Sequence, residues 1–111
     1  MKSIILVKSI IFYILLILNL NAAQPDYFKK GKLLFDKNQI DKSKILFEKD
    51  IVFNPRSENS YLYLAKIFNK KENEEEEEIN LNNVLLINPK NDEALYMLAI
   101  LKINQSDYQE S

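Results

Sequence analysis

The sequence predicts an all-α chain in which pairs of helices repeat along the molecule. Apolar residues recur at the spacing of amphipathic helices from residue 27 onward. Two apolar runs stop at Asn-Pro dipeptides, and their prolines, Pro55 and Pro89, are 34 residues apart in the sequence. We call this number of residues the proline spacing. The 111 residues include one Gly and three Pro, too few turn formers for an all-β fold. We therefore expect a helical repeat whose period, about 34 residues, equals the proline spacing.

Residues 1–23 have the pattern of a secretory signal peptide. Lys2 and Lys8 come before a short apolar run at residues 9–18, and the small residues Ala22 and Ala23 follow it. The uninterrupted apolar core is about ten residues long, whereas a spanning helix needs roughly 20. We expect cleavage after Ala22 or Ala23, with an uncleaved membrane anchor through residues 4–20 as the alternative. In the first case residues 24–111 are periplasmic or secreted, and in the second they are held at the inner membrane.

Residues 24–57 form the first expected helix pair. The first helix should run to about Lys37, and Asn38 suits the left-handed conformation at its end. Asp41 is a fair N-cap for the second helix. That helix should run to about Phe53, and Pro55 ends the pair.

Residues 58–91 form the second pair. A helix is expected from Glu58 to about Lys71, followed by a turn at Glu72 and Asn73 and a second helix from Glu74 to Ile87. Ile79, Leu81, Val84, Leu85 and Ile87 are expected to point inward. Glu72 and Glu77 are unusual for a turn and for an inward position, so the alternative is a second helix that begins near Ile79 or is shifted in register.

Residues 92–111 begin a third pair that is incomplete. We expect a helix from Asp92, a turn at residues 104–106 and the start of another helix at Asp107. Residues 92–104 are apolar on nearly every side, whereas a terminal repeat normally has a polar outer face. Truncation of a longer array, self-association through this helix, and a covering partner are the three explanations. We favour truncation and expect residues 24–111 to dimerise or aggregate.

These residues resemble the tetratricopeptide repeat family, which has a period of about 34 residues. The resemblance covers residues 24–111 and implies a right-handed helix–turn–helix solenoid of about two and a half repeats after the N-terminal segment. By this resemblance, small residues allow close helix contact, large residues fill the gap beside them, and prolines end each unit. The residues assigned to these structural positions are Tyr27, Gly31, Pro55, Tyr61, Ala65, Pro89 and Ala99.

The same resemblance implies a concave face lined by the first helix of each unit. Aromatic residues would give this face contact area, and lysines would select acidic ligands. The alternative is an ordinary solvated face with some aromatics packed between helices. The polar pattern by which some family members bind a chaperone tail is not met. The residues assigned to the groove are Phe28, Lys29, Lys32, Phe35, Leu62, Tyr63, Lys66, Lys70, Tyr96, Met97 and Ile100.

The composition argues against catalysis. The chain has no Cys and no His, and therefore lacks a cysteine nucleophile, a thiolate metal site, and the commonest general base and metal ligand. The formal net charge of -1 gives no drive toward nucleic acid. Five carboxylates at residues 74–78 are expected to be a solvated helix start, with an acidic partner-binding patch or a metal site as alternatives. We expect no enzyme activity and no cofactor.

The expected function is a non-catalytic scaffold of the cell envelope that binds a protein or peptide segment. One alternative is the N-terminal fragment of a larger repeat-containing enzyme or envelope assembly factor. Another alternative is a membrane-anchored accessory subunit.

Overall fold

The computed structural model of the chain describes residues 2–22 and 25–110, with side chains described for residues 3–17 and 25–109. These residues form six α-helices and no strands, which confirms the predicted all-α class. The predicted cleavage after Ala22 or Ala23 involves residues 23 and 24, which lie outside the described residues. The helices are α1 (Lys2–Ala22), α2 (Tyr27–Asp36), α3 (Ile40–Phe53), α4 (Glu58–Lys70), α5 (Glu74–Ile87) and α6 (Asp92–Glu110).

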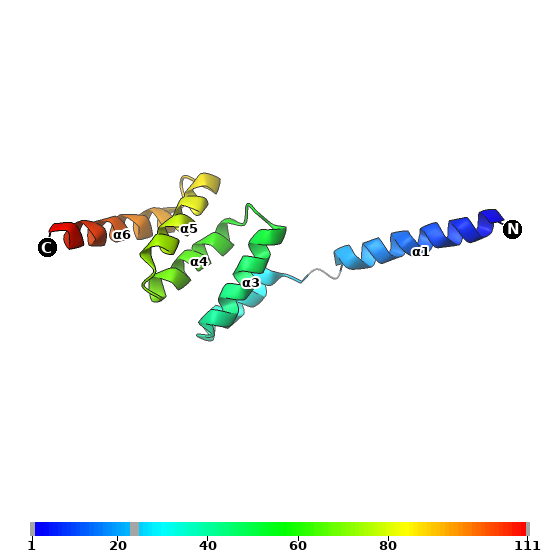
Figure 1. Cartoon of the computed structure of the whole chain (residues 1–111), viewed down its shortest axis with the longest axis horizontal. Coiled ribbons are helices and arrows are strands. Elements are labelled where there is room, and N and C mark those ends of the chain that lie inside the picture. The colour runs from blue at the N-terminus through cyan, green and yellow to red at the C-terminus, as the bar shows by residue number, and fades with distance from the viewer. Residues whose placement is uncertain (1, 23–24, 111) are drawn as a thin grey trace.

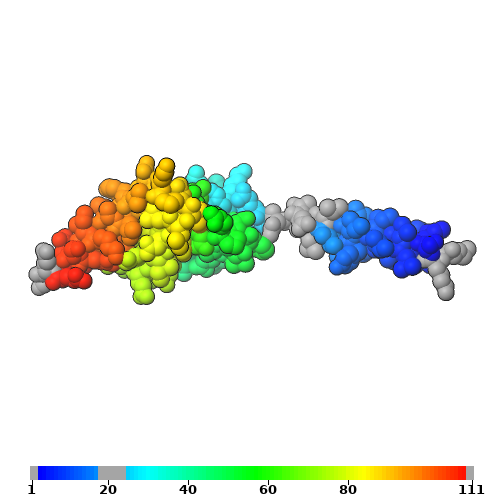
Figure 2. All heavy atoms as spheres, turned by 90° about the horizontal axis from the view of Figure 1, so that it is seen from above, coloured from blue at the N-terminus to red at the C-terminus, as the bar shows by residue number. Residues whose placement is uncertain are grey.

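α1 is an apolar helix that stands apart from the other five (Figure 1). Its large apolar side chains between Ile4 and Ile17 are 41% to 69% exposed. Figure 2 shows α1 as a rod beside the body built by α2 to α6, and the chain extends over 83 × 29 × 20 Å. Within the described part of the chain, no helix has both the length and the apolar content that a membrane span requires.

The turns within the helix pairs use left-handed residues. Asn38 has φ 61° between α2 and α3, as its residue type predicts, and Glu72 has φ 57° between α4 and α5. A left-handed residue after a helix lets following backbone N–H groups bond to its last carbonyls. Gln39 N–H donates to the Leu34 carbonyl at 2.8 Å, and Asn73 N–H donates to the Phe68 carbonyl at 2.9 Å. The two turns are thus built in the same way.

The helix bounds recur at the proline spacing. α3 covers residues 40–53 and α5 covers residues 74–87, so the start and the end of the helix are both shifted by that spacing. α4 begins at Glu58 and α6 begins at Asp92, again separated by the proline spacing. Equivalent positions along the chain therefore begin and end helices, apart from the start of α2 and the end of α6.

The core consists of two clusters that join successive helices. Phe47, Leu64 and Ile67 are buried together between α3 and α4. The second cluster joins α4, α5 and α6, and its buried members are Leu62, Ala65, Leu81, Val84, Ala94 and Leu101. α4 takes part in both clusters and is the central helix of the body.

One predicted helix start is wrong, and another is confirmed. α3 begins at Ile40 with Gln39 as its N-cap, and Asp41 lies in the first turn, where it pairs with Lys71 at 2.5 Å. α5 extends from Glu74 to Ile87, as predicted, and the alternative start near Ile79 is wrong, because Asn73 caps the helix by accepting a hydrogen bond from the Glu76 N–H at 3.2 Å. The side-chain acceptor at the N-cap and the acidic residues of the first turn both stabilise a helix that starts at Glu74.

The inward face of α5 also differs from expectation at one position. Leu81 and Val84 are fully buried, and Leu85 packs against the second cluster. Ile79 is 46% exposed, so its predicted inward orientation is wrong. The inward face at that end of α5 is taken by Glu77 and Asn80, which are buried instead.

The predicted turn at residues 104–106 is also wrong, because α6 continues as one helix to Glu110. Ser106 follows Glu72 by the proline spacing, yet its hydroxyl donates to the Lys102 carbonyl at 3.0 Å inside the helix. Gln105 reaches Glu74 at 3.5 Å, which ties this part of α6 to α5. No Gly or Pro interrupts the segment, so nothing local breaks the helix.

Candidate functional site

Tyr63 of α4 is the centre of an aromatic cluster between α2, α3 and α4. Its ring is stacked on Phe47 with the centroids 5.1 Å apart. It meets Phe28 and Phe35 edge-on, at 5.7 and 5.1 Å. Stacked and edge-on ring pairs of this kind contribute stability in addition to that from the area they bury. Phe28, Phe35 and Tyr63 thus pack between helices and keep only part of each ring exposed.

Two lysines of α4 lie over this cluster. Lys66 Nζ is 4.7 Å from the centroid of the Tyr63 ring, and Lys70 Nζ is 5.7 Å from that of Phe35. An ammonium group in this position is attracted by the negative face of the ring. Lys66 also pairs with Glu93 of α6 at 2.6 Å, so its charge is partly neutralised within the chain.

Of the remaining predicted groove residues on α2 and α4, two are exposed and one is buried in the core. Lys29 and Lys32 are exposed on α2. Leu62 is 5% exposed within the second core cluster, so its assignment to the groove surface is wrong. The reason is that α5 and α6 cover this side of α4, which widens its buried stripe. We call the following set the aromatic–lysine face: Phe28, Lys32, Phe35, Tyr63, Lys66 and Lys70.

The groove residues predicted on α6 lie in a different environment. Tyr96 is 68% exposed and Ile100 is 40% exposed, while Met97 packs partly against the second core cluster. These three line a hollow of about 260 Å³ together with Asn69 and Glu77.

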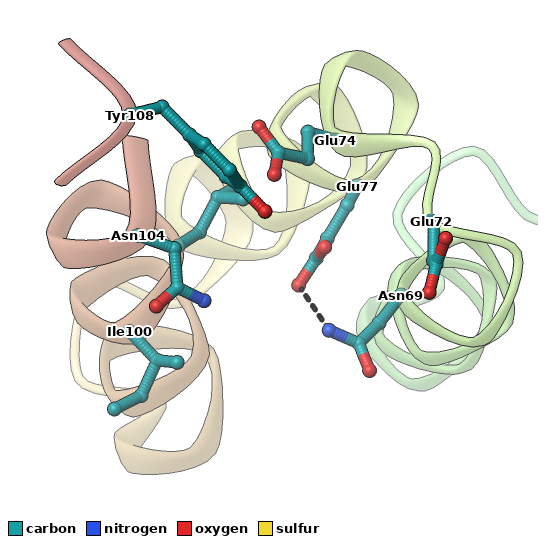
Figure 3. Close-up of a pocket in the computed structure, with 8 residues that line it drawn as sticks. Asn69, Glu72, Glu74, Glu77, Ile100, Asn104 and Tyr108 are labelled. Atoms are coloured by element: carbon teal, nitrogen blue, oxygen red, sulfur yellow. Dashed lines mark hydrogen bonds between the residues drawn. The ribbon is translucent and has the colours of Figure 1, made fainter. Parts of the chain in front are cut away.

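A second hollow, of about 370 Å³, shares three of those residues. Figure 3 shows its walls, which come from the turn after α4, the start of α5 and the C-terminal half of α6. We call it the acidic hollow because three of its lining residues are glutamates. Its lining residues are Asn69, Glu72, Glu74, Glu77, Ile100, Leu101, Asn104 and Tyr108.

Glu77 is the most unusual residue of the acidic hollow. It is 3% exposed, and its carboxylate accepts a hydrogen bond from Asn69 Nδ2 at 3.2 Å (Figure 3). Burial raises the pKa of Glu77, and nearby Glu74 adds to this, while the bond from Asn69 opposes it. The expectation that residues 74–78 are a solvated helix start is therefore wrong for Glu77. Among the described residues, no group of three or more acidic side chains is arranged to hold a metal ion.

A second buried carboxylate, Asp50, lies at the junction between α3 and α4. It accepts hydrogen bonds from Ser60 Oγ at 2.5 Å, Ser57 Oγ at 2.6 Å and Asn54 Nδ2 at 3.0 Å. Burial alone would raise the pKa of Asp50, but the three hydrogen bonds together lower it below its usual range. This network was not among the features predicted from the sequence. The sequence does carry a local indication of it, because the short polar residues Asn54, Ser57 and Ser60 closely follow Asp50 along the chain.

The junction between α5 and α6 is held by an acid on another helix, so here the junction residues are the hydrogen-bond donors. Glu58 at the start of α4 accepts hydrogen bonds from Asn91 Nδ2 at 2.7 Å and from Asn88 Nδ2 at 2.8 Å. These two bonds lower the pKa of Glu58. Asn91 Oδ1 also accepts from the Ala94 N–H at 2.9 Å, which caps α6. The two Asn-Pro junctions thus use different polar networks.

Several predicted structural positions have the contacts expected of them. Gly31 is buried against Phe47, and Ala65 is fully buried in the second cluster. Tyr27 stacks on Phe53 with the centroids 5.6 Å apart. Tyr61 packs against the second cluster.

The other structural positions are exposed. Pro55 and Pro89 each follow the last residue of a helix by two residues and lie at the surface. Ala99 is exposed, so its predicted role in a close helix contact within the chain is wrong. α6 continues through the position where the first two pairs turn back, and no described helix covers Ala99.

No family model, no curated protein and no solved structure matches the chain. The geometry of the aromatic–lysine face and of the acidic hollow is therefore what supports a function.

Proposed function

We propose that the chain is a non-catalytic scaffold that binds an acidic segment of a protein or peptide on its aromatic–lysine face. The observation that carries the proposal is the placement of Lys66 and Lys70 over the rings of Tyr63 and Phe35. The rings offer apolar area that is already held in place, and the ammonium groups offer charge beside it. A ligand with carboxylates next to an apolar side chain fits both features.

The rigidity of this face supports binding without chemistry. Phe28, Phe35 and Tyr63 hold one another through ring contacts, so little side-chain freedom is lost when a ligand binds. Lys32 and Lys70 are exposed and form no ion pair with any described side chain, so both charges are available.

We further propose that α2 to α6 form a tetratricopeptide-like solenoid of about two and a half units. The shift of both bounds of α3 onto those of α5 by the proline spacing supports this. The left-handed residues Asn38 and Glu72, which are separated by the same spacing, support it independently. Gly31 and Ala65 have the small size that close helix contact requires in such units.

We also propose that the scaffold works outside the cytoplasm, behind a signal segment in α1. The exposure of the apolar side chains of α1 and its separation from the body support a role in targeting (Figure 1). Mass spectrometry of the mature protein separates the two alternatives. A new N-terminus near residue 23 or 24 would indicate cleavage, and retention of Met1 would indicate an anchor.

Peptide selection tests the binding proposal. A library of short random peptides should yield ligands in which Asp or Glu flank an aromatic or aliphatic residue, and their binding should weaken with added salt. The variant Lys32→Glu/Lys70→Glu reverses both available charges and should lose about tenfold in affinity.

The matched control reverses two lysines elsewhere. Lys42 on α3 and Lys90 before α6 are exposed, so Lys42→Glu/Lys90→Glu changes the net charge equally without touching the face. This control should bind like the wild type. Equal losses in the two double variants would mean that overall charge, and not this face, attracts the peptides.

A further inference from the structure

Glu77 is a buried carboxylate with no positive charge paired to it. Its side chain is 3% exposed and lines the acidic hollow. Asn69 Nδ2 donates to Oε1 of Glu77, and this is the one hydrogen bond that the described residues give to the carboxylate. None of the ion pairs among the described residues includes Glu77. A buried charge is costly unless it is paired, so a cation bound beside Glu77 would stabilise the fold.

The carboxylates at the two helix junctions are better satisfied than Glu77. Asp50 accepts three hydrogen bonds and Glu58 accepts two, and the pKa of each is lowered. Glu77 accepts one, and its pKa is raised. Its second oxygen, Oε2, is open to the hollow, because no fully enclosed side-chain oxygen of the described residues lacks a hydrogen-bond partner. Figure 3 shows this oxygen turned away from Asn69.

Two further glutamates line the same hollow. Glu74 lies in the first turn of α5 and Glu72 in the turn before it, and Figure 3 shows the three carboxylates on separate sides. Neither Glu72 nor Glu74 forms an ion pair with a described lysine or arginine. The positive end of the α5 dipole is also here, but it amounts to about half an elementary charge. Three carboxylates outweigh it, so the hollow attracts cations.

The wall of the hollow that α6 provides is apolar. Ile100 and Leu101 line it, and the adjoining hollow of about 260 Å³ continues along Tyr96 and Met97. Glu77 and Ile100 line both hollows. The acidic hollow, of about 370 Å³, has the size of a small ligand site. A ligand with a cationic end at Glu77 and an aliphatic stem along α6 therefore fits both walls.

We propose that the acidic hollow binds a primary ammonium group on an aliphatic stem, as found in the lysine side chain of a partner protein or in a free alkyl diamine. An ammonium group donates three hydrogen bonds in different directions, which suits carboxylates on separate sides of a hollow. A guanidinium group is a planar fork that pairs best with a single carboxylate. The acidic side chains of the described residues are not arranged as ligands of a metal ion, so an organic cation fits them better.

Titration of the full chain with n-pentylammonium chloride, followed by amide NMR shifts, tests the proposal. The shifts should saturate and should be largest around Asn69, Glu77 and Asn104. Glu77→Gln keeps an oxygen for Asn69 and removes the charge, so it should weaken binding about tenfold. Circular dichroism checks that this variant is folded. Glu75→Gln, at an exposed position of the same turn, is the matched control and should bind like the wild type.

Two further probes distinguish the source of the ammonium group. Cadaverine represents a free diamine, and Nα-acetyl-lysine N-methylamide represents a lysine within a protein. Both should bind in the wild type and weaken in Glu77→Gln. Tighter binding of the blocked lysine would indicate a protein partner, and tighter binding of cadaverine would indicate a free amine.

Three outcomes would overturn the proposal. One is the absence of a saturable shift with n-pentylammonium. Another is equally tight binding of n-pentanol, which has the same stem without the charge. The third is the same affinity for n-pentylammonium in Glu77→Gln as in Glu75→Gln. The acidic hollow shares no residue with the aromatic–lysine face, so each of these outcomes would leave the peptide-binding proposal untouched.

Discussion

Gly31 of α2 lies so close to Phe47 of α3 that a Cβ atom at residue 31 would be 2.9 Å from Phe47 Cε1. Phe47 is fully buried, so its ring has little room to move away. The equivalent pair, one proline spacing later, is Ala65 and Leu81, both fully buried in one cluster. The first pair of helices thus combines Gly with the larger Phe, and the second combines Ala with the smaller Leu.

Gly31→Ala should therefore destabilise the chain despite the better helix propensity of Ala. The clash should cost about 1–3 kcal/mol, against about 1 kcal/mol gained from propensity. Phe47→Leu should restore room for the methyl group and convert the first crossing to the combination found in the second. Urea unfolding of both single variants and the double variant measures the coupling. Additive effects would show that the two side chains do not limit each other.

Asp50→Ala should destabilise the chain by about 2–3 kcal/mol, because it leaves the buried hydroxyl of Ser60 without its acceptor. The pKa of Asp50 is lowered in the fold, so its contribution is present above its unfolded pKa of about 4 and is lost as the pH falls through the folded value. The stability difference between the wild type and Asp50→Asn should therefore shrink in acid. A difference that is the same at neutral pH and in acid would contradict this account of the network.

Glu77→Gln should raise the free energy of unfolding at neutral pH, whereas Asp50→Asn should lower it. The pKa of Glu77 is raised by burial, so the fold favours its neutral form and is destabilised by the carboxylate at neutral pH. Gln keeps an oxygen for Asn69 and removes the charge, so the variant should be more stable than the wild type at neutral pH. The advantage should vanish once the pH is below the unfolded pKa of about 4.3. Glu75→Gln, at an exposed position of the same turn, is the matched control and should change little.

Glu72→Gly should stabilise the chain by about 0.5–1 kcal/mol, because Glu72 has φ 57° and Gly adopts that conformation without a Cβ penalty. Asn38→Gly should gain less, since Asn tolerates the left-handed region better than Glu. Lys37→Gly is the control, because Lys37 has φ -85° and no such penalty to relieve. Thermal unfolding followed by circular dichroism ranks the three variants. A gain at Lys37 as large as that at Glu72 would point to an effect on the unfolded chain.

The local elements were predictable because their signals lie within a few residues. The Asn-Pro dipeptides at residues 54–55 and 88–89 follow the ends of α3 and α5, and the residue type of Asn38 suits its left-handed turn. Glu72 was recognisable only through its distance from Asn38, since Glu has no preference for that conformation. Ser106 shares the same spacing and remains helical, so spacing alone does not make a turn.

The candidate site was predictable only in part, because burial depends on neighbours that are distant in sequence. Phe28 and Tyr63 were assigned to a surface, and they are half-buried because α2 and α4 both pack against α3. Leu62 is buried because α5 and α6 cover its side of α4. The pairing of Lys66 with Glu93 joins residues from different helices, and no local pattern indicates it. The acidic hollow likewise requires α6 to continue past residue 104.

The stacking of α2 to α6 on their chain neighbours has a consequence for how the molecule loses its structure. α4 is held from both sides by the two core clusters, whereas α6 is attached chiefly through α5. When most contacts are between neighbours, opening starts at an end and proceeds inward. Amide hydrogens of α6 should therefore exchange with solvent first and those of α4 last.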